Sequence, residues 1–323
     1  MKRKLVVILM TVSVLALTAC GGSESKTEQP VEETVELKEE VVLEETEEEV
    51  AVEEEEKVET VYLVASRKWG YVSDGVREEN FTENTYDEKG NEILSVNKNA
   101  DGSIRSTYSR EYDENGNLLK LTMEYEDSVS YIEHEYGENG NLSKIVESNE
   151  NGEITSTELY EYDANNMLMK TSKFNAENVL EQVCEYDENG TMRKMIFYMD
   201  GVVSTWYEYN EKGDEILCKW EMEDFVTEEI CINEYDENDK LVKVIKNYTD
   251  LSGDTTEYIL TYEYDEYGNV LNVYQDGQIL EQYKYEYDEN GNCINEIWKN
   301  ASGDLESFTE REYISMEVPA KNN

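Results

Sequence analysis

Hydrophobic and polar side chains alternate along most of this chain, in short stretches separated by turn-forming residues. In the stretch 258–264 every second residue is Tyr or Leu, while Thr261 and Glu263 lie between them. Residues 283, 285 and 287 are likewise all tyrosine, and Lys284 and Glu286 separate them. Since successive side chains of a strand point to opposite faces, this pattern predicts strands with one aromatic face and one acidic face.

The alternating stretches belong to a repeated unit. The segment 111–118, EYDENGNL, recurs in variant form so that nine full copies follow one another at spacings of 23 to 29 residues, and a truncated copy stands at Glu312-Tyr313. Such a period is typical of proteins in which each repeat is one small supersecondary element. We call the leading residues of the full copies the signature tyrosines: Tyr86, Tyr112, Tyr136, Tyr162, Tyr186, Tyr209, Tyr235, Tyr264 and Tyr287.

Each unit contains two turn signals. One follows the signature tyrosine, as in Asn115-Gly116, and the other lies midway to the next tyrosine, as in Asp200-Gly201. Asn and Gly tolerate positive φ, so both signals favour tight turns. The unit is therefore predicted to be a pair of antiparallel strands. The residues six positions after the tyrosine are mostly apolar and are its expected packing partners: Leu118, Leu142, Leu168, Met192, Leu241, Val270 and Cys293.

These signals predict an all-β protein built from tandem two-stranded β-hairpin repeats. We expect one long, open antiparallel sheet, curved or spiralled, over residues 61–316, with about twenty short strands. Its unpaired edges are expected at Tyr62–Val64 and Tyr313–Met316, and residues 317–323 form a disordered tail.

The repeat resembles the YD repeat of the RHS-repeat family, on the strength of Tyr-Asp-Glu-Asn-Gly-Asn-Leu at 112–118 and its copies over residues 86–294. The resemblance implies continuous β-hairpin sheet and says little about function. Long arrays in that family form a hollow shell around a toxin, which we do not expect from nine copies. Aromatic cell-wall-binding or toxin-tail repeats are the alternative resemblance, although the regular Gly-Trp of choline-binding repeats is missing.

The first residues resemble a bacterial lipoprotein signal. Basic residues 2–4 precede an apolar run, 5–17, that is too short to span a membrane, and Leu17-Thr18-Ala19-Cys20 is similar to a lipobox. The resemblance implies a signal peptide of residues 1–19, lipid on the sulfur of Cys20, and anchoring to the extracytoplasmic face of the bacterial cell membrane. An ordinary signal peptide with an incidental cysteine is the alternative.

An acidic segment follows the signal, and charge dominates the composition. Residues 21–60 hold 17 Glu and 3 Lys and no aromatic residue, so residues 20–60 are predicted to be a disordered tether. A partial helix is the alternative. The whole chain has a formal net charge of −48, of which −37 falls in residues 61–323. Nucleic-acid sites need a basic surface, so nucleic acid is excluded as a partner, and a neutral glycan or a basic protein is favoured.

Few residues suggest catalysis. The only histidine, His134, occupies a position that is Tyr in several other copies, and no Walker, Rossmann or Gly-x-Ser-x-Gly motif is present. Paired carboxylates occur throughout and follow from the repeat. The segment 113–117 partly resembles a calcium loop, but its glycine is fourth rather than sixth, which favours a turn and leaves weak calcium binding open. We expect no catalytic residue, no cofactor and no dedicated metal site.

Four cysteines follow Cys20, and their spacing fits no zinc motif. Cys218 and Cys231 are predicted to face each other across a hairpin near residues 224–225, where an exported protein could form a disulfide. Cys184 and Cys293 stand at positions that are Tyr or Leu in other copies and are expected to pack.

Three functions are compatible with these features. The favoured one is a non-catalytic, membrane-anchored surface protein that binds a glycan or protein through its aromatic-rich sheet. The alternatives are an envelope hydrolase that uses paired carboxylates and a purely structural spacer or shield. A concave aromatic groove in the sheet would favour binding.

Overall fold

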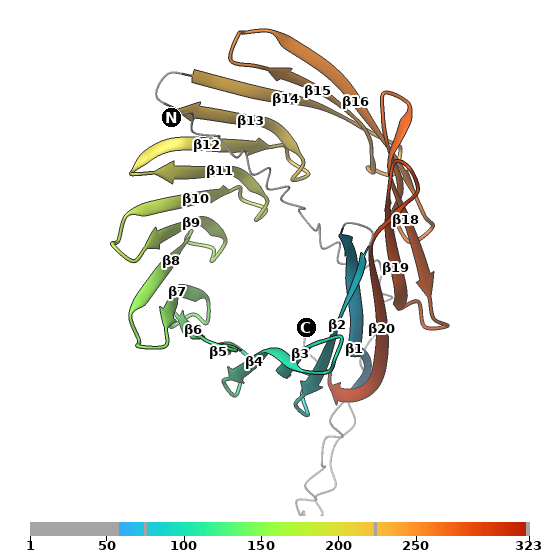
Figure 1. Ribbon diagram of the computed structural model, residues 1–323. Helices are drawn as coiled ribbons and strands as arrows, with labels where there is room; N and C mark the ends of the chain where they lie inside the picture. The colour runs from blue at the N-terminus through green and yellow to red at the C-terminus, as the bar shows by residue number, and fades with distance from the viewer. Residues whose placement is uncertain (1–57, 74–75, 223–224, 321–323) are drawn as a thin grey trace, which may run out of the picture. The chain divides into compact units, whose positions relative to one another are not determined.

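The computed structural model describes residues 58–73, 76–222 and 225–320, which belong to one compact unit, Glu55–Asn323. Within these ranges there are twenty β-strands and no helix (Figure 1). The first ten strands are β1 (Val58–Ser73), β2 (Val76–Tyr86), β3 (Glu92–Asn99), β4 (Ile104–Tyr112), β5 (Leu118–Tyr125), β6 (Val129–Tyr136), β7 (Leu142–Asn149), β8 (Ile154–Tyr162), β9 (Leu168–Asn175) and β10 (Leu180–Tyr186). The others are β11 (Met192–Met199), β12 (Val202–Tyr209), β13 (Glu215–Met222), β14 (Phe225–Tyr235), β15 (Leu241–Thr249), β16 (Thr255–Tyr264), β17 (Val270–Gln275), β18 (Gln278–Tyr287), β19 (Cys293–Asn300) and β20 (Leu305–Pro319).

The strands close into a barrel. Each strand pairs antiparallel with its neighbours in the chain, and β1 additionally pairs antiparallel with β20. We call the β1–β20 pairing the seam. It extends from Val58 opposite Pro319 to Tyr71 opposite Ser307, with a register shift between Val64 and Ser66. Figure 1 shows the strands following one another around a ring, in which the last strand lies beside the first.

The sheet is closed, so the prediction of an open, curved or spiralled sheet is wrong. The all-β class and the antiparallel two-stranded repeats are confirmed. The expected edges are paired with each other, because Tyr62 lies opposite Ser315 and Val64 opposite Tyr313. Unpaired edge strands expose a row of backbone donors and acceptors, and closure satisfies them. The strand β1 begins at Val58, ahead of the expected boundary at residue 61, and β20 extends to Pro319.

The turn after each signature tyrosine has one recurring geometry. In the copy at 113–117, Oδ1 of Asp113 accepts hydrogen bonds from the amides of Asn115 and Asn117 at 2.9 and 2.8 Å. The amide of Gly116 donates to the carbonyl of Asp113 at 3.1 Å, and Gly116 has a φ of 85°. This is a turn closed by one residue in the left-handed region, so glycine is favoured at that position and not at the preceding asparagine. Asn166 and Asp239 take the same conformation where glycine is replaced, with φ of 64° and 63°.

The signature tyrosines connect consecutive units. Each lies directly opposite the residue six positions later, as Tyr112 does with Leu118, which confirms the expected packing partners. The hydroxyl of the next signature tyrosine, Tyr136, then donates to the backbone carbonyl of Leu118 at 2.8 Å. The same bond joins Tyr162 to the carbonyl of Leu142. One side chain therefore packs on its own hairpin and hydrogen-bonds to the hairpin before it.

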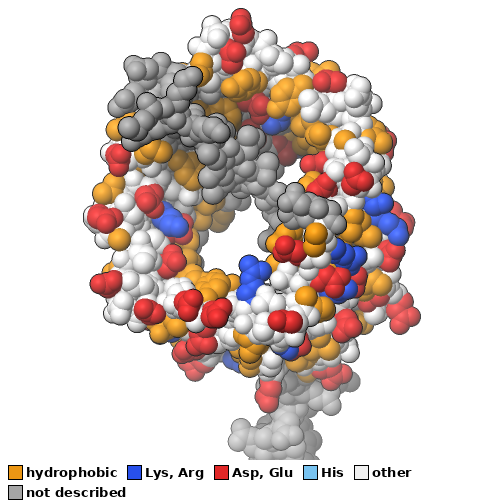
Figure 2. All heavy atoms as spheres, viewed as in Figure 1, with side chains coloured by type: hydrophobic (Ala, Val, Ile, Leu, Met, Phe, Trp, Pro, Cys, Tyr) orange, Lys and Arg blue, Asp and Glu red, His pale blue; other side chains and the backbone are white. Residues whose placement is uncertain are grey.

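The opposite face of the sheet carries the predicted row of glutamates, but a row of lysines stands across from it. Glu135 lies opposite Lys144 and pairs with it at 2.9 Å, and Glu234 lies opposite Lys243 and pairs with it at 2.7 Å. Figure 2 shows many acidic side chains and few basic ones on the side in view. Cross-strand pairing reduces the repulsion within this face, although each exposed pair contributes at most about 1 kcal/mol.

Candidate functional site

A cavity of about 740 Å³ lies on the tyrosine-bearing face of the sheet, next to the seam. It touches six strands that are adjacent in the ring, β20, β1, β2, β3, β4 and β5. Neighbouring strands are about 4.8 Å apart, so one cavity can touch all six only where the face curves around it. This is the concave, inner face of the ring. The lining residues are Val64, Arg67, Trp69, Thr82, Asn84, Tyr86, Glu92, Ser95, Asn97, Arg105, Ser106, Tyr108, Arg110, Tyr125 and Arg311.

The side chains at one position of the repeat are different beside the cavity. Two residues before a signature tyrosine, the side chain points to the same inner face, and in four other copies this position is tyrosine. Beside the cavity this position is occupied by Asn84 and Arg110. In the truncated copy, Arg311 occupies it, two residues before Tyr313. The neighbouring strand β3 contributes the small Ser95, which is 7% exposed. Polar or charged side chains thus replace tyrosine at these positions of the wall.

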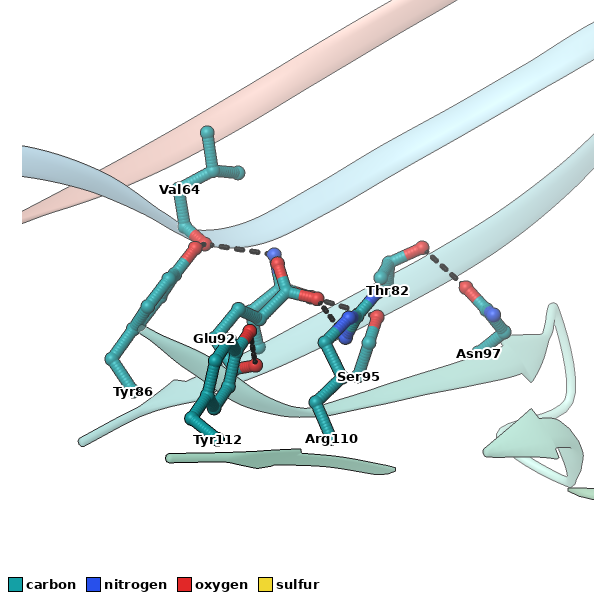
Figure 3. A network of polar contacts seen from close by, with 9 residues as sticks. Val64, Thr82, Tyr86, Glu92, Ser95, Asn97, Arg110 and Tyr112 are labelled. Atoms are coloured by element: carbon teal, nitrogen blue, oxygen red, sulfur yellow. Dashed lines mark hydrogen bonds and ion pairs between the residues drawn. The ribbon is translucent and has the colours of Figure 1, made fainter. Parts of the chain in front are cut away.

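A network of hydrogen bonds holds the polar lining in place (Figure 3). The backbone carbonyl of Val64 accepts from both Tyr86 Oη (2.9 Å) and Asn84 Nδ2 (3.0 Å). Asn84 Oδ1 in turn accepts from Ser95 Oγ at 2.9 Å. Thr82 Oγ1 donates to Asn97 Oδ1 at 2.7 Å. The wall is therefore pre-organised, which reduces the entropy lost when a ligand binds.

Aromatic side chains cover the remainder of the lining. Trp69 Nε1 donates to Thr82 Oγ1 at 3.3 Å, which fixes the orientation of the indole. The rings of Tyr108 and Tyr125 meet edge to face at 6.1 Å, and their hydroxyls are 2.9 Å apart. Burial raises the pKa of Tyr86 above its usual value, in keeping with its position in the wall. Fixed aromatic rings beside hydrogen-bonding groups are the usual composition of a small-molecule site.

The cavity has an unusual charge for this protein. The chain contains seven arginines, and four of them line this one cavity together with a single acidic residue, Glu92. Glu92 pairs with Arg110 (Figure 3), and Arg311 Nη2 contacts Glu296 Oε2 at 2.9 Å. Arg67 and Arg105 form no ion pair with any residue in the described ranges. The inner face next to the seam is thus locally basic in a strongly acidic domain.

A second cluster of ionisable groups lies on the inner face, on strands β13 to β16. Lys246 Nζ contacts Glu229 Oε1 at 2.6 Å, and Tyr258 Oη donates to Glu229 Oε2 at 2.6 Å. Glu215, Glu229 and Cys231 bring one ligand atom each within 4.8 Å of one another. Burial raises the pKa of the Cys231 thiol to about 12, so this sulfur is a protonated, poor metal ligand at neutral pH. We interpret this cluster as a satisfied polar part of the packed wall.

The predicted disulfide is not formed. Cys218 and Cys231 are both free and buried in the structure. The register of the β13–β14 hairpin places Cys218 opposite Glu229, and Cys231 lies two residues further along β14, opposite Lys246 of β15. The two thiols therefore share the inner face without facing each other. Cys184 is free and buried and Cys293 is free and half-buried, in keeping with packing positions.

Of the other residues singled out in the sequence, Tyr86 lines the cavity, and the other eight signature tyrosines do not. Cys20, the signal peptide of residues 1–19 and the tether up to residue 57 lie outside the described residues. No helix in the described ranges is long and apolar enough to cross a membrane. His134 is half-buried on β6, and burial lowers its pKa. Sequence reasoning missed Trp69 and the four arginines, although the arginines at the usual tyrosine positions were a visible signal.

Comparisons with known proteins give no family for this chain. No family model matches it, and no curated protein is similar to it in sequence. Among solved structures, a crystal structure of TcdB2-TccC3-Cdc42 matches with a TM-score of 0.43 and 11% identity over 80% of this chain and 16% of that chain. A porin-like protein from Bacteroides uniformis ATCC 8492 matches with a TM-score of 0.34 and 10% identity over 78% of this chain and 98% of that chain. The chain thus spans 16% of the length of the first of these.

Proposed function

We propose that this protein is a non-catalytic binding protein that takes part of its partner, a glycan or a protein segment, into the cavity beside the seam. The observation that carries the proposal is the pre-organised cavity of about 740 Å³, which has fixed aromatic and hydrogen-bonding side chains. Its volume lies within the range of roughly 300–1,000 Å³ typical of ligand sites. A purely structural spacer would not require a cavity whose polar and aromatic lining is held in place by hydrogen bonds.

The lining supports binding better than hydrolysis. A hydrolase that uses paired carboxylates needs one acid and one base or nucleophile at roughly 5–9.5 Å from each other. The cavity offers one carboxylate, Glu92, and this group is already paired with Arg110. Indole and phenol rings can instead stack on a sugar or a peptide side chain, while the amides and hydroxyls around them hydrogen-bond to it.

The type of repeat and the cellular location of this site are inferred from the sequence. We propose that the repeats are of the YD type and that lipid on Cys20 anchors the protein to the extracytoplasmic face of the cell membrane. The acidic tether would then separate the ring from the membrane surface. Replacing Cys20→Ser is expected to move the protein from the membrane fraction to the soluble fraction, and unchanged membrane recovery would contradict the anchor.

Binding is tested with the full-length protein in detergent, on a glycan array and a peptide array. Trp69→Ala is expected to lose the strongest signals at least tenfold, because it removes the largest aromatic surface of the cavity. Trp206→Ala is the matched control. Trp206 lies opposite Lys219, whose ammonium sits 4.8 Å from its ring, on the other face of the sheet. Equal signals for both variants, or no signal on either array, would contradict the proposed function.

A further inference from the structure

Two arginines face each other across the seam, an arrangement that lowers the stability of the fold through charge repulsion. The register of β1 and β20 places Arg67 directly opposite Arg311. Side chains that face each other in an antiparallel pair are about 5 Å apart at Cβ, and like charges in such a pair repel. Glu296 balances the charge of Arg311, but no residue in the described ranges forms an ion pair with Arg67.

Arg105 extends the same basic patch from the other side of the cavity. The register shifts in β4 between Ser106 and Ile104, so that Arg105 turns to the inner face and lines the cavity. Its guanidinium has one hydrogen bond, to Asn80 Oδ1 at 3.5 Å, and no ion pair within the described ranges. Among the residues that the structure describes, Arg67 and Arg105 therefore both keep guanidinium donors that no ion pair occupies.

This arrangement is unexpected in a domain with so many carboxylates. Residues 61–323 carry −37, and elsewhere lysines face glutamates across the strands. Two guanidinium groups that have no ion-pair partner within the described ranges are stabilised when an anion enters the cavity. Guanidinium groups bind planar carboxylates and phosphates through paired N–H donors.

We propose that the cavity selects an anionic ligand, whose carboxylate or phosphate group is held by Arg67 and Arg105 beside Arg311. This inference rests on the proposed binding function and changes the expected chemistry of the partner. The negative net charge of the chain favours neutral or basic partners, whereas the cavity itself favours an acidic group. The aromatic lining, with Trp69 and Tyr108, receives the uncharged part of the ligand.

Three sugars that share one ring test the inference: galactose, galacturonate and galactose 6-phosphate. Their binding to the full-length protein in detergent is measured by calorimetry. We expect at least one of the two acids to bind tenfold or more tightly than galactose, since a charge-assisted hydrogen-bond pair supports about that factor. The stronger of the two acids identifies carboxylate or phosphate as the source of the charge.

Variants separate a ligand-binding role from a structural one. Arg67→Gln is expected to abolish the preference for the acid and, without ligand, to raise the melting temperature, because it removes the repulsion from Arg311. Arg77→Gln is the control. Arg77 lies 3.7 Å from the ring of Phe308 and pairs with Glu79, so its loss should lower the melting temperature and leave binding unchanged.

Each result has a defined reading. Equal binding of galactose and both acids, or a preference that survives in Arg67→Gln, overturns the anionic site and leaves the proposed binding function intact. No binding of any of the three sugars also overturns it, and the glycan and peptide arrays then decide the proposed function separately. A lower melting temperature for Arg67→Gln without ligand would show that Arg67 is a structural residue.

Discussion

Two parts of the inner wall are built from the same repeat and differ in what fills them. On β11 to β13, Tyr207 lies opposite Cys218, which is 2% exposed, and its ring meets Phe197 edge to face at 6.2 Å. On β4 and β5, Tyr108 meets Tyr125 in nearly the same geometry, at 6.1 Å, but beside the open cavity. The backbone repeat is therefore a scaffold that tolerates either a packed or a hollow wall.

The difference lies in the side chains at equivalent positions. The position that is Tyr207 in the packed part is Asn84 or Arg110 beside the cavity. A signature tyrosine is present in both parts, followed by Asp113 beside the cavity and by Asn210 in the packed part, and tyrosine hydroxyls form bonds between units, as at Tyr136 and Tyr162. Apart from Tyr86, which serves both purposes, the residues that build the ring are thus largely separate from those that line the cavity. A site can consequently be altered without disturbing the ring.

The largest expected loss of stability comes from a substitution in the packed part. Tyr207→Ala should lower the free energy of unfolding by about 3 kcal/mol, because it leaves a cavity beside buried Cys218. The matched change Tyr108→Ala should cost only about 1 kcal/mol, since this ring already borders open space and loses mainly its aromatic pair. Urea denaturation measures both. Equal losses would show that the two parts are packed alike.

An intermediate effect tests a bond between units, from the hydroxyl of a signature tyrosine to a backbone carbonyl of the preceding unit. Tyr264→Phe removes the hydroxyl that donates to the carbonyl of Leu241 at 2.6 Å and should lower the free energy of unfolding by about 1 kcal/mol. Tyr267→Phe is the control, because Tyr267 is 57% exposed and keeps its ring in contact with Tyr287, at 4.1 Å between ring centroids and a tilt of 33°. If the two variants unfold at the same urea concentration, the hydroxyl does not stabilise the ring.

The smallest effect concerns His134, which stands at the tyrosine position between the two parts. Burial lowers its pKa in the folded protein, so the unfolded chain binds the proton more readily, and stability falls as the pH drops below the ordinary value of 6.5. His134→Tyr should remove this decrease between about pH 7 and about pH 5.5. Turn aspartates such as Asp113 have lowered pKa values, and their contribution is lost only in more acidic solution.

Melting temperatures of wild type and His134→Tyr, measured across this range, check the prediction. The difference between the two proteins should widen as the pH falls. Parallel curves would show that protonation of His134 does not affect folding.

The sequence was sufficient for the strands, the turns and the alternation of faces, because each depends on residues close together in the chain. The glycine four residues after a signature tyrosine and the aspartate directly after it define the turn locally. Closure could not be predicted, since it depends on the twist accumulated over twenty strands and on pairing between residues as distant as Val58 and Pro319.

The cavity was missed for a related reason. Its residues come from both ends of the domain, and Arg67 and Arg311 become neighbours only after the ring closes. The departures from tyrosine at Arg110 and Arg311 were visible in the sequence, but without closure nothing brought them together. The disulfide prediction was wrong by two residues, because Cys218 lies opposite Glu229 and Cys231 comes two residues later in β14.

The seam also limits how such a protein can evolve. In an open array, a duplicated hairpin simply lengthens the chain, and terminal units protect the ends. In a closed ring, one added hairpin would widen the circumference by about 10 Å and move every unit relative to the pairing of β1 with β20. The number of repeats is then part of the structure, and gain or loss of a unit would reshape the cavity beside Arg67 along with the ring.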